Sequence, residues 1–270
     1  MELTVLMDNH TEIDVYYLGE PAVSYWIRAD GKQFLFDAGY SDAFLHNAQD
    51  MNIDVTAADA VILSHGHNDH TGGLRALLSH MTNRTPRLIA HPHALSPKHL
   101  GGMDIGMPLP LDVLSHHMKL TLTKQPLWLT ERLLFLGEIP RTVAFEPPVA
   151  IGETYLADGL TEPDFLMDDT ALAYVGNDGL YLITGCSHAG ICNIIRYAKQ
   201  VTGVSHIAGL IGGLHLFSLD ERSQKTIALL AEERIPALYP CHCTSFAVRA
   251  ALHTLSPVQE VGVGMTLKWE

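Results

Sequence analysis

Apolar and polar positions alternate in short blocks along the chain, and this pattern predicts strands interspersed with helices. Short apolar runs bounded by glycine, proline or polar residues have the length of buried strands, whereas longer stretches with apolar residues every three or four positions are typical of helices. The predicted strands are 3–7, 22–28, 33–36, 60–63, 86–90, 128–130, 133–135, 143–145, 170–175, 180–184, 207–211, 237–239 and 261–267. The predicted helices are 42–51, 74–81, 191–201, 220–233 and 246–255. The absence of any linker-like stretch favours a single domain, residues 1–270, of class α/β with two comparable halves.

The segment 95–125 departs from this regular pattern. Its hydrophobic periodicity is weak, and it contains prolines at 108 and 110, a glycine pair at 101–102 and three methionines. Irregular segments of this length within a layered fold often form lids or substrate walls. We therefore predict a lid or insert at about 95–125, in which His99, His116 and His117 are solvated.

The composition limits the classes of partner. The chain has 17 Lys and Arg against 30 Asp and Glu, a formal net charge of −13, and shows no basic stripe for phosphates, which argues against nucleic acid as the main partner. Residues 1–5 lack the features of a signal peptide, and no apolar run approaches the ~18 residues that span a membrane. We expect a cytoplasmic protein with a small-molecule substrate and no nucleic-acid or membrane partner, and we allow for a homodimer.

The densest cluster of potential metal ligands follows the predicted strand 60–63. Four of them, His65, His67, Asp69 and His70, occur within six residues. In extended backbone the side chains at i and i+2 share a side, so His65 and His67 can bind one ion, while Asp69 and His70 begin a helix and can face a second. Imidazole and carboxylate suit zinc, manganese or iron, and two ions roughly 3.5–4 Å apart can hold a hydroxide for attack on an ester-like bond.

Histidines also end strands in the second half of the chain, at His188, His215 and His242. Loops beyond strand ends gather into one cleft in sheet-based folds, so these residues can complete the coordination of two ions. For His215 we weigh contact with the substrate against a purely structural role. His91 and His93 also follow a strand, but we favour a loop-positioning role for them.

Three further side chains near these strand ends have alternative interpretations. Asp37, at the end of strand 33–36, could orient a metal-bound histidine or cap the following helix. Alternation in extended backbone would turn Cys241 and Cys243 away from the side that His242 faces, so we assign His242 to metal and both thiols to packing. The same alternation puts Cys186 on the side of His188, as a metal ligand, a partner of a ligand or a small buried residue.

The motifs resemble a known group of proteins. The stretch L-S-H-G-H-N-D-H-T-G-G-L at 63–74 resembles the signature of the metallo-β-lactamase fold superfamily of binuclear metallohydrolases. L-F-D-A-G at 35–39, L-G-E-I-P-R at 136–141, T-G-C-S-H-A-G-I at 184–191, I-G-G-L-H-L at 211–216 and C-H-C-T at 241–244 extend the likeness over nearly the whole chain. Together they resemble the subgroup of 7,8-dihydropterin-6-methyl-4-(β-D-ribofuranosyl)-aminobenzene-5′-phosphate synthase-like proteins.

The resemblance implies a four-layer αββα sandwich, with two mixed sheets and helices outside. It also implies two divalent metal ions at the edge where strands end, with zinc as the first choice and manganese or iron as alternatives. It implies His65, His67 and His188 on one ion, and Asp69, His70 and His242 on the other. Two positions depart from the pattern: Cys186 stands where many members supply a bridging aspartate, and Ser245 where the subgroup would have glycine.

These inferences favour a metal-dependent hydrolase in which a hydroxide held by two ions attacks a small ester-, lactone- or phosphoester-like substrate. Asp69 is expected to orient that hydroxide or take its proton, and His215 to contact the substrate or the leaving group. A pterin-condensing synthase, as the subgroup's name suggests, is the first alternative. A noncatalytic protein that uses the ions to bind a ligand is the second.

Overall fold

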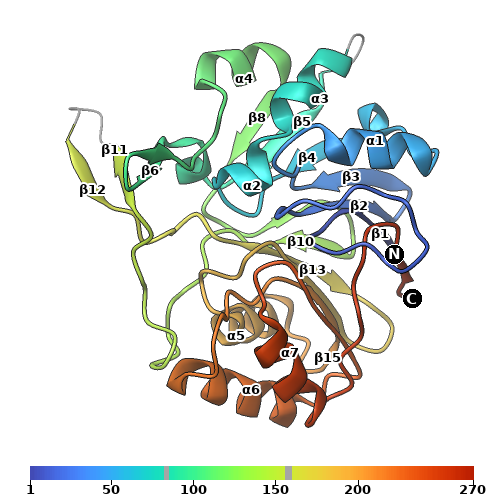
Figure 1. The fold of residues 1–270 in the computed structure, drawn as a ribbon, viewed down its shortest axis with the longest axis vertical. Coiled ribbons are helices and arrows are strands. Elements are labelled where there is room, and N and C mark those ends of the chain that lie inside the picture. Colours follow the sequence, from blue (N-terminus) through green and yellow to red (C-terminus); the bar gives the residue numbers. More distant parts are fainter. Residues whose placement is uncertain (82–84, 156–159) are drawn as a thin grey trace.

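Two large β-sheets packed face to face, with helices covering both outer faces, form the body of the protein (Figure 1). The computed structural model describes residues 1–81, 85–155 and 160–270. The four layers confirm the αββα sandwich that the resemblance implied.

The first sheet contains seven strands in the order β17-β1-β2-β3-β4-β5-β8. Strands β3, β4, β5 and β8 run parallel to one another, while β17, β1 and β2 pair antiparallel. The bounds are Glu2–Met7 (β1), Ser24–Ala29 (β2), Lys32–Phe36 (β3), Ala60–Ile62 (β4), Arg87–Ala90 (β5), Lys119–Leu122 (β8) and Thr266–Lys268 (β17).

The second sheet contains six strands in the order β16-β15-β14-β13-β10-β9. Its β14, β15 and β16 are parallel and the remaining pairs antiparallel, so each sheet has a parallel portion whose strands end at one edge. The bounds are Leu127–Trp128 (β9), Leu133–Phe135 (β10), Ala171–Val175 (β13), Leu180–Thr184 (β14), Ile207–Gly212 (β15) and Ala237–Pro240 (β16).

Alternating side chains divide the core into three apolar layers. In β4, Ala60 and Ile62 point into the layer between the sheets, whereas Val61 packs outward against the helices. The layer outside the first sheet is covered by α1, α3 and α4, and that outside the second by α5, α6 and α7 (Figure 1). The helices are Ala43–Asp50 (α1), Asn68–Thr71 (α2), Leu74–His80 (α3), Leu111–His117 (α4), Ile191–Thr202 (α5), Glu221–Glu233 (α6) and Phe246–His253 (α7), with short 3-10 turns at Val55–Ala57 and Pro92–Leu95.

Two predicted strands differ most from the structure, and a third, 128–130, is replaced by Leu127–Trp128. Residues 143–145 form no strand, because the side-chain oxygen of Asn193 on α5 accepts hydrogen bonds from the backbone N–H groups of Thr142 and Val143. The last strand spans Thr266–Lys268 rather than 261–267, because Gly264 has a left-handed φ of 94° that interrupts the extended backbone.

The segment 95–125 divides between two structures. Its final part, β8, is an edge strand of the first large sheet and therefore belongs to the body of the domain. Its first part contributes β6 (Lys98–Leu100) and β7 (Met103–Asp104) to a small four-stranded sheet with β11 (Glu153–Tyr155) and β12 (Thr161–Pro163), which projects at the left of Figure 1. The small sheet approaches the predicted metal ligands, since the carbonyl of Ile105 accepts a hydrogen bond from the N–H of Asn68 at 2.8 Å.

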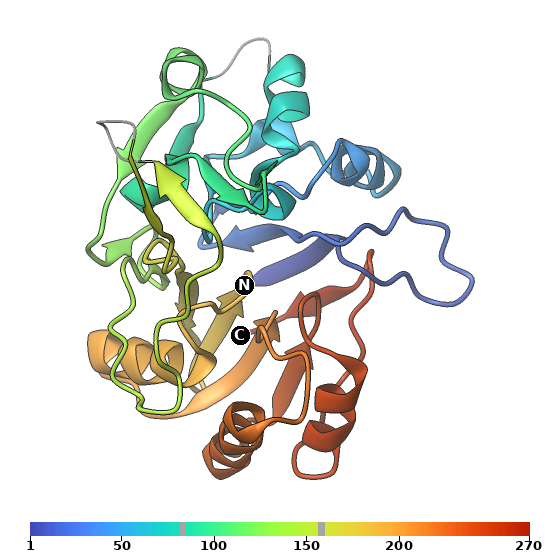
Figure 2. The same ribbon diagram turned by 60° about the vertical axis from the view of Figure 1, so that its left-hand side comes forward.

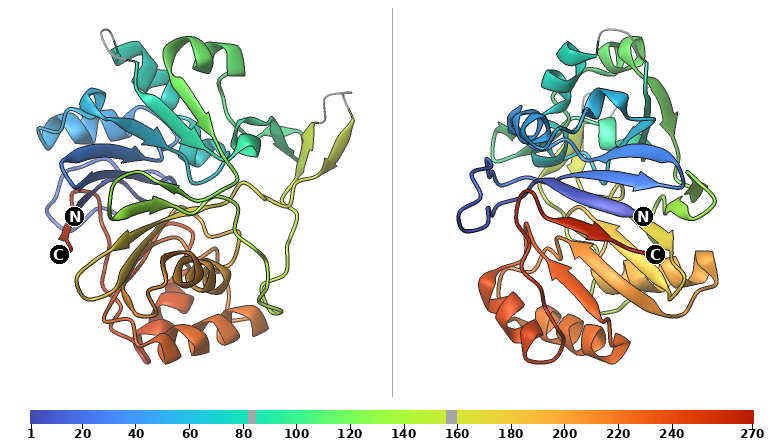
Figure 3. Two further views of the ribbon diagram at one scale, coloured as in Figure 1. Left: turned by 180° about the vertical axis from the view of Figure 1, so that it is seen from behind. Right: turned by 90° about the vertical axis from the view of Figure 1, so that its right-hand side faces the viewer.

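The two termini lie together, seen in both views of Figure 3, where the N–H of Trp269 donates to the carbonyl of Met1 at 2.8 Å. The loop between β1 and β2 extends away from the body at the right of Figure 2. Among the described residues, no helix combines the length and apolar character required to cross a membrane.

Candidate metal centre

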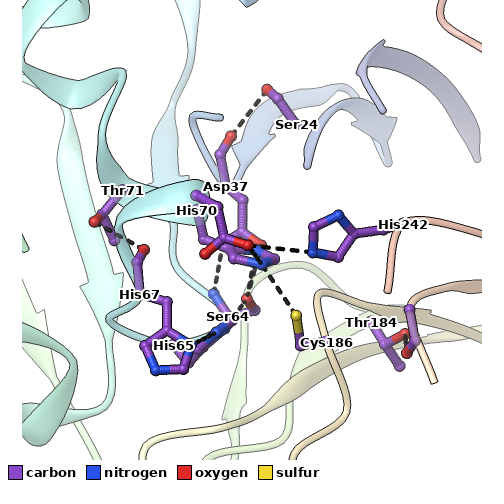
Figure 4. Close-up of polar contacts among 12 residues, drawn as sticks. Ser24, Asp37, Ser64, His65, His67, His70, Thr71, Thr184, Cys186 and His242 are labelled. Atoms are coloured by element: carbon purple, nitrogen blue, oxygen red, sulfur yellow. Dashed lines mark hydrogen bonds and ion pairs between the residues drawn. The ribbon is translucent and has the colours of Figure 1, made fainter. Parts of the chain in front are cut away.

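Strand ends from both halves of the chain bring the predicted ligands together (Figure 4). His65 and His67 follow β4, and Asp69 and His70 lie on α2. The second half supplies the side chains that follow β14, β15 and β16, namely Cys186, His188, His215 and His242. Together with Cys243, they form three groups of donor atoms among the described residues, and within each group all the atoms lie within 4.8 Å of one another.

The first group consists of His65, His67 and His188. Their ring centroids are 4.7 to 5.0 Å apart, and His65 Nε2 lies 3.0 Å from His67 Nδ1. Burial lowers the pKa of His67 to about 4 and those of His65 and His188 well below the ordinary value. These rings are therefore neutral at pH 7, the state in which an imidazole nitrogen binds a metal.

Three ring nitrogens of this group have no hydrogen-bond partner among the described residues and are suited to bind a metal ion. His67 Nε2 and both ring nitrogens of His188 are buried without a hydrogen-bond partner in the part of the chain that the structure describes. An unpaired buried polar atom costs about 1–3 kcal/mol, so three of them in one place require compensation. A divalent cation fits this donor set, because three imidazoles are a common coordination sphere for zinc.

The second group consists of Asp69, His70, Cys186 and His242. Asp69 Oδ2 lies 3.6 Å from His70 Nε2 and 3.4 Å from His242 Nε2, and Cys186 Sγ lies 3.3 Å from His70 Nε2. Burial alone would raise the pKa of Asp69, but the adjacent His70 and His242 hold it well below its usual range. Cys186, for which the sequence left three interpretations open, therefore lies among the predicted ligands, in the place of the expected aspartate.

Asp37 orients His70 within this group. Its Oδ2 lies 2.7 Å from His70 Nδ1 and accepts a bond from Ser64 Oγ at 2.7 Å, while its Oδ1 accepts from the Ser64 N–H at 2.7 Å. The residue preceding α1 is Asp42, so Asp37 supports a ligand rather than capping that helix. Burial alone would lower the pKa of His70, yet Asp69 and Asp37 raise it to about 9, and the same negative field favours a metal cation at Nε2.

The predicted ligands His188 and His242 in the second half of the chain are held by contacts that the sequence analysis did not identify. Asn9 Oδ1 lies 3.1 Å from His242 Nδ1, and Asp8 Oδ2 accepts from the His242 N–H at 3.1 Å. Arg141 Nη1 donates to the carbonyl of His188 at 2.7 Å. Asp8 and Asn9 end β1 as Asp37 ends β3, so their strand-end position was the available signal.

A buried ion pair supports the turn that carries His65 and His67. Lys98 of β6 lies 2.6 Å from Asp164 and 3.1 Å from Asp168, and Asp168 accepts the Gly66 N–H at 2.8 Å. Glycine is required between the two histidines, since a Cβ there would lie 2.4 Å from the carbonyl of Ala94. The small sheet thus stabilises the histidine turn through Lys98.

The predicted roles of the two thiols beside His242 need one correction. Cys241 packs in the core with its Sγ 3.3 Å from the hydroxyl of Tyr25, as expected. The alternation predicted for Cys243 is wrong, because its thiol lies with Cys186 and His215 in the third group of donor atoms. Strict alternation fails because β16 ends at Pro240 and His242 has a left-handed φ of 50°.

The remaining predicted histidines lie in different surroundings. His215 packs against His188 in a tilted arrangement, with ring centroids 4.1 Å apart. His91 instead contacts Glu138 at 3.1 Å, and within the described ranges neither His91 nor His93 joins a donor group. His99 pairs with Asp104 at 2.6 Å on the small sheet.

Comparison with known proteins agrees with this geometry. The model of the Metallo-beta-lactamase superfamily matches residues 18–199. The chain belongs to this superfamily. The metallo-beta-lactamase superfamily is one of metal-dependent hydrolases, and the match spans the turn with His65, His67, Asp69 and His70 as well as Cys186 and His188.

Individual members are similar over nearly their full length. The chain is 29% identical over 260 residues to the 7,8-dihydropterin-6-methyl-4-(beta-D-ribofuranosyl)-aminobenzene-5'-phosphate synthase of Methanocaldococcus jannaschii, with 91% of this chain and 88% of the synthase covered. The crystal structure of Tm1679, a metal-dependent hydrolase of the beta-lactamase superfamily, superposes with a TM-score of 0.84 at 25% identity, covering 99% of this chain and 98% of Tm1679. The crystal structure of the metallo-beta-lactamase fold protein YhfI from Bacillus subtilis superposes with a TM-score of 0.60 at 15% identity, covering 99% of each chain.

Proposed function

We propose that this protein is a metal-dependent hydrolase that acts on a small ester, lactone or phosphoester. His65, His67 and His188 would hold one divalent ion, and the group of Asp69 would hold the other. Zinc is our first choice for both ions, and manganese and iron are the alternatives. The observation that carries the proposal is the set of buried imidazole nitrogens of His67 and His188 that lack a hydrogen-bond partner in the described structure. They lie in the first of two donor sets, each built from both halves of the chain.

Such ions would lower the pKa of water towards ~7 and polarise a carbonyl or phosphoryl oxygen of the substrate. The side chain of Asp69 is 30% exposed, in contrast to the fully buried His70 beside it. We therefore assign to Asp69 the role of orienting a water molecule on the open side of the site and accepting its proton. His215 lies against His188 and Phe217 with its Nδ1 buried, and we assign it contact with the substrate or the leaving group.

The decisive variant replaces His67 and His70 together by alanine, which removes one ligand from each proposed ion. We expect elemental analysis to show two divalent ions fewer per chain in the double variant than in the wild type. A panel of lactones, thioesters and phosphodiesters, assayed with added zinc or manganese, should be hydrolysed by the wild type alone. The matched control replaces His116 and His117, two histidines on α4 outside the three donor groups, and should keep metal and activity.

Unchanged metal content in the His67/His70 double variant would disprove the metal assignment. Metal loss without hydrolysis of any substrate by the wild type would leave the site standing and reject the hydrolase. Tight binding of one of these compounds without turnover would instead support a noncatalytic ligand-binding protein.

A pterin-condensing synthase is the second candidate, and the similarity to the Methanocaldococcus jannaschii synthase over 91% of the chain favours it. Incubation with a pterin diphosphate and an aminobenzene acceptor separates the two reactions. A coupled product detected by mass spectrometry would support the synthase, whereas hydrolysis of the diphosphate without coupling would exclude it.

A further inference from the structure

Cys186, His215 and Cys243 bring three metal-binding side chains together beside the two proposed ions. One donor atom from each lies within 4.8 Å of the other two. The backbone N–H of His215 lies 3.3 Å from Cys243 Sγ, which is itself 3.5 Å from the carbonyl of Cys186. These residues come from three separate loops, after β14, β15 and β16, so their proximity is a product of the fold.

The local backbone is built to permit this approach. A Cβ at position 213 would lie 2.5 Å from Cys243 Sγ, so only glycine leaves room for the thiol there. His215 and Ser187 have left-handed φ values of 50° and 61°, which cost a residue with a side chain roughly 1–3 kcal/mol and occur most often at functional sites. One of these left-handed residues is His215 itself, and the other directly follows Cys186.

The His215 ring provides a second, independent observation. Its Nδ1 is buried and has no hydrogen-bond partner among residues 1–81, 85–155 and 160–270. The ring is held between His188 and Phe217, with centroids at 4.1 and 4.7 Å. The fixed imidazole, with one nitrogen that has no hydrogen-bond partner in the described structure, and the two thiols together form a set of atoms suited to bind a metal ion.

We propose that Cys186, His215 and Cys243 form a third cation site, selective for a thiophilic ion such as zinc or cadmium. Two sulfurs and one imidazole nitrogen match the ligands that zinc takes in proteins, and three protein ligands leave a fourth position for water or a small molecule. The site differs from the group of Asp69 in chemistry, because it contains no carboxylate and is therefore poor for magnesium or manganese. It shares Cys186 with that group, so the two sites are coupled through one sulfur.

The proposal is tested by metal content, so its test does not depend on which reaction the protein catalyses. It is tested with the full chain, reduced with a phosphine, freed of metal and titrated with cadmium. Elemental analysis gives the number of bound ions, and the ultraviolet thiolate-to-cadmium charge-transfer band reports sulfur ligands. Cys243→Ser removes a proposed ligand, and Cys241→Ser is the matched control from the same triplet, since the Cys241 thiol packs against Tyr25.

We expect three cadmium ions per wild-type chain and per Cys241→Ser chain, and two per Cys243→Ser chain. The charge-transfer band of Cys243→Ser should fall to roughly half, because one of the two thiolate ligands remains. His215→Ala should also lose one ion and keep most of the band. Equal stoichiometry and an equal band in the wild type and Cys243→Ser would overturn the proposal, as would a Cys186–Cys243 disulfide that resists the phosphine.

The double variant at His67 and His70 separates this proposal from the proposed function. If it retains one cadmium ion that Cys243→Ser then removes, the third site exists whatever the outcome for the other two. If that double variant keeps all its ions while Cys243→Ser loses one, the proposed function fails and the third site stands.

Discussion

Replacing Asp37 by asparagine tests how the protein prepares His70 to bind metal. The carboxylate is fully buried and accepts three hydrogen bonds, two from Ser64 and one from His70 Nδ1. Asparagine keeps the size of the side chain, and its oxygen can still accept the Ser64 N–H. Its NH₂ group then takes the place of Oδ2 and faces His70 Nδ1 as a donor.

The asparagine NH₂ and a protonated Nδ1 would be two hydrogen-bond donors facing each other. His70 is therefore expected to adopt the tautomer in which Nε2 carries the proton and Nδ1 accepts the bond. A protonated Nε2 has no lone pair for the ion that we assign to the group of Asp69. The hydrogen bond between Asp37 and His70 is charge-assisted and contributes about 1.5–3 kcal/mol. Loss of such a support typically lowers metal affinity 10–100-fold, which is ~1.4–2.7 kcal/mol and thus of the same size.

The assay is competition for zinc against a chromophoric chelator, which resolves the affinities of successive ions. We expect one affinity to fall 10–100-fold in Asp37→Asn while that of the three-histidine group stays within about threefold. Asp59→Asn is the control, because Asp59 also accepts a backbone N–H in the first sheet, from Gln33 at 2.9 Å. Asp59 is exposed and precedes β4, whereas the ligands follow that strand. Unchanged affinities in Asp37→Asn, or equal losses in both variants, would refute the reasoning.

Two further predictions concern stability. Lys98→Met leaves the two buried aspartates Asp164 and Asp168 without their cation, so the free energy of unfolding in urea should fall by about 3–5 kcal/mol. Lys119 is exposed, and Lys119→Met should change that free energy by less than ~0.5 kcal/mol. Equal effects of the two variants would contradict the buried ion pair. Burial raises the pKa of Asp169 to about 6, against the opposing effect of Arg141, so the stabilisation that this carboxyl contributes is complete below its unfolded pKa and is lost as the pH rises through about 6. In metal-free protein the wild type should therefore lose about 1 kcal/mol relative to Asp169→Asn between pH 5 and 7.5, and a pH-independent difference between the two would contradict this assignment.

The parts of the site that the sequence predicted are those fixed by local geometry. His65, His67, Asp69 and His70 follow one strand without interruption, so their spacing alone places them at two neighbouring groups. The arrival of His188 and His242 from the second half also follows from a general rule, since parallel strands end at a common edge.

The parts that escaped prediction depend on backbone dihedrals and on long-range pairing. Cys243 reaches Cys186 because His242 is left-handed, which no hydrophobic pattern reveals. Lys98 and Asp168 are 70 positions apart and meet only because the small sheet packs against the histidine turn. Residues 143–145 read as a strand because their apolar pattern does not show that Asn193 satisfies the backbone in place of a neighbouring strand.

Two of the three donor groups, those of His65 and of Asp69, combine residues from two distant parts of the chain, so ions bound there would help to hold the two halves together. His70 and Cys186 are 116 positions apart, so an ion bound by both would act as a removable cross-link between the first and second halves. The unfolded chain does not bring these side chains together, and binding energy therefore becomes folding energy, about 4 kcal/mol when the free ion is at a thousandfold excess over its dissociation constant. Supply of the ion would then set the lifetime of the folded protein as well as its chemistry.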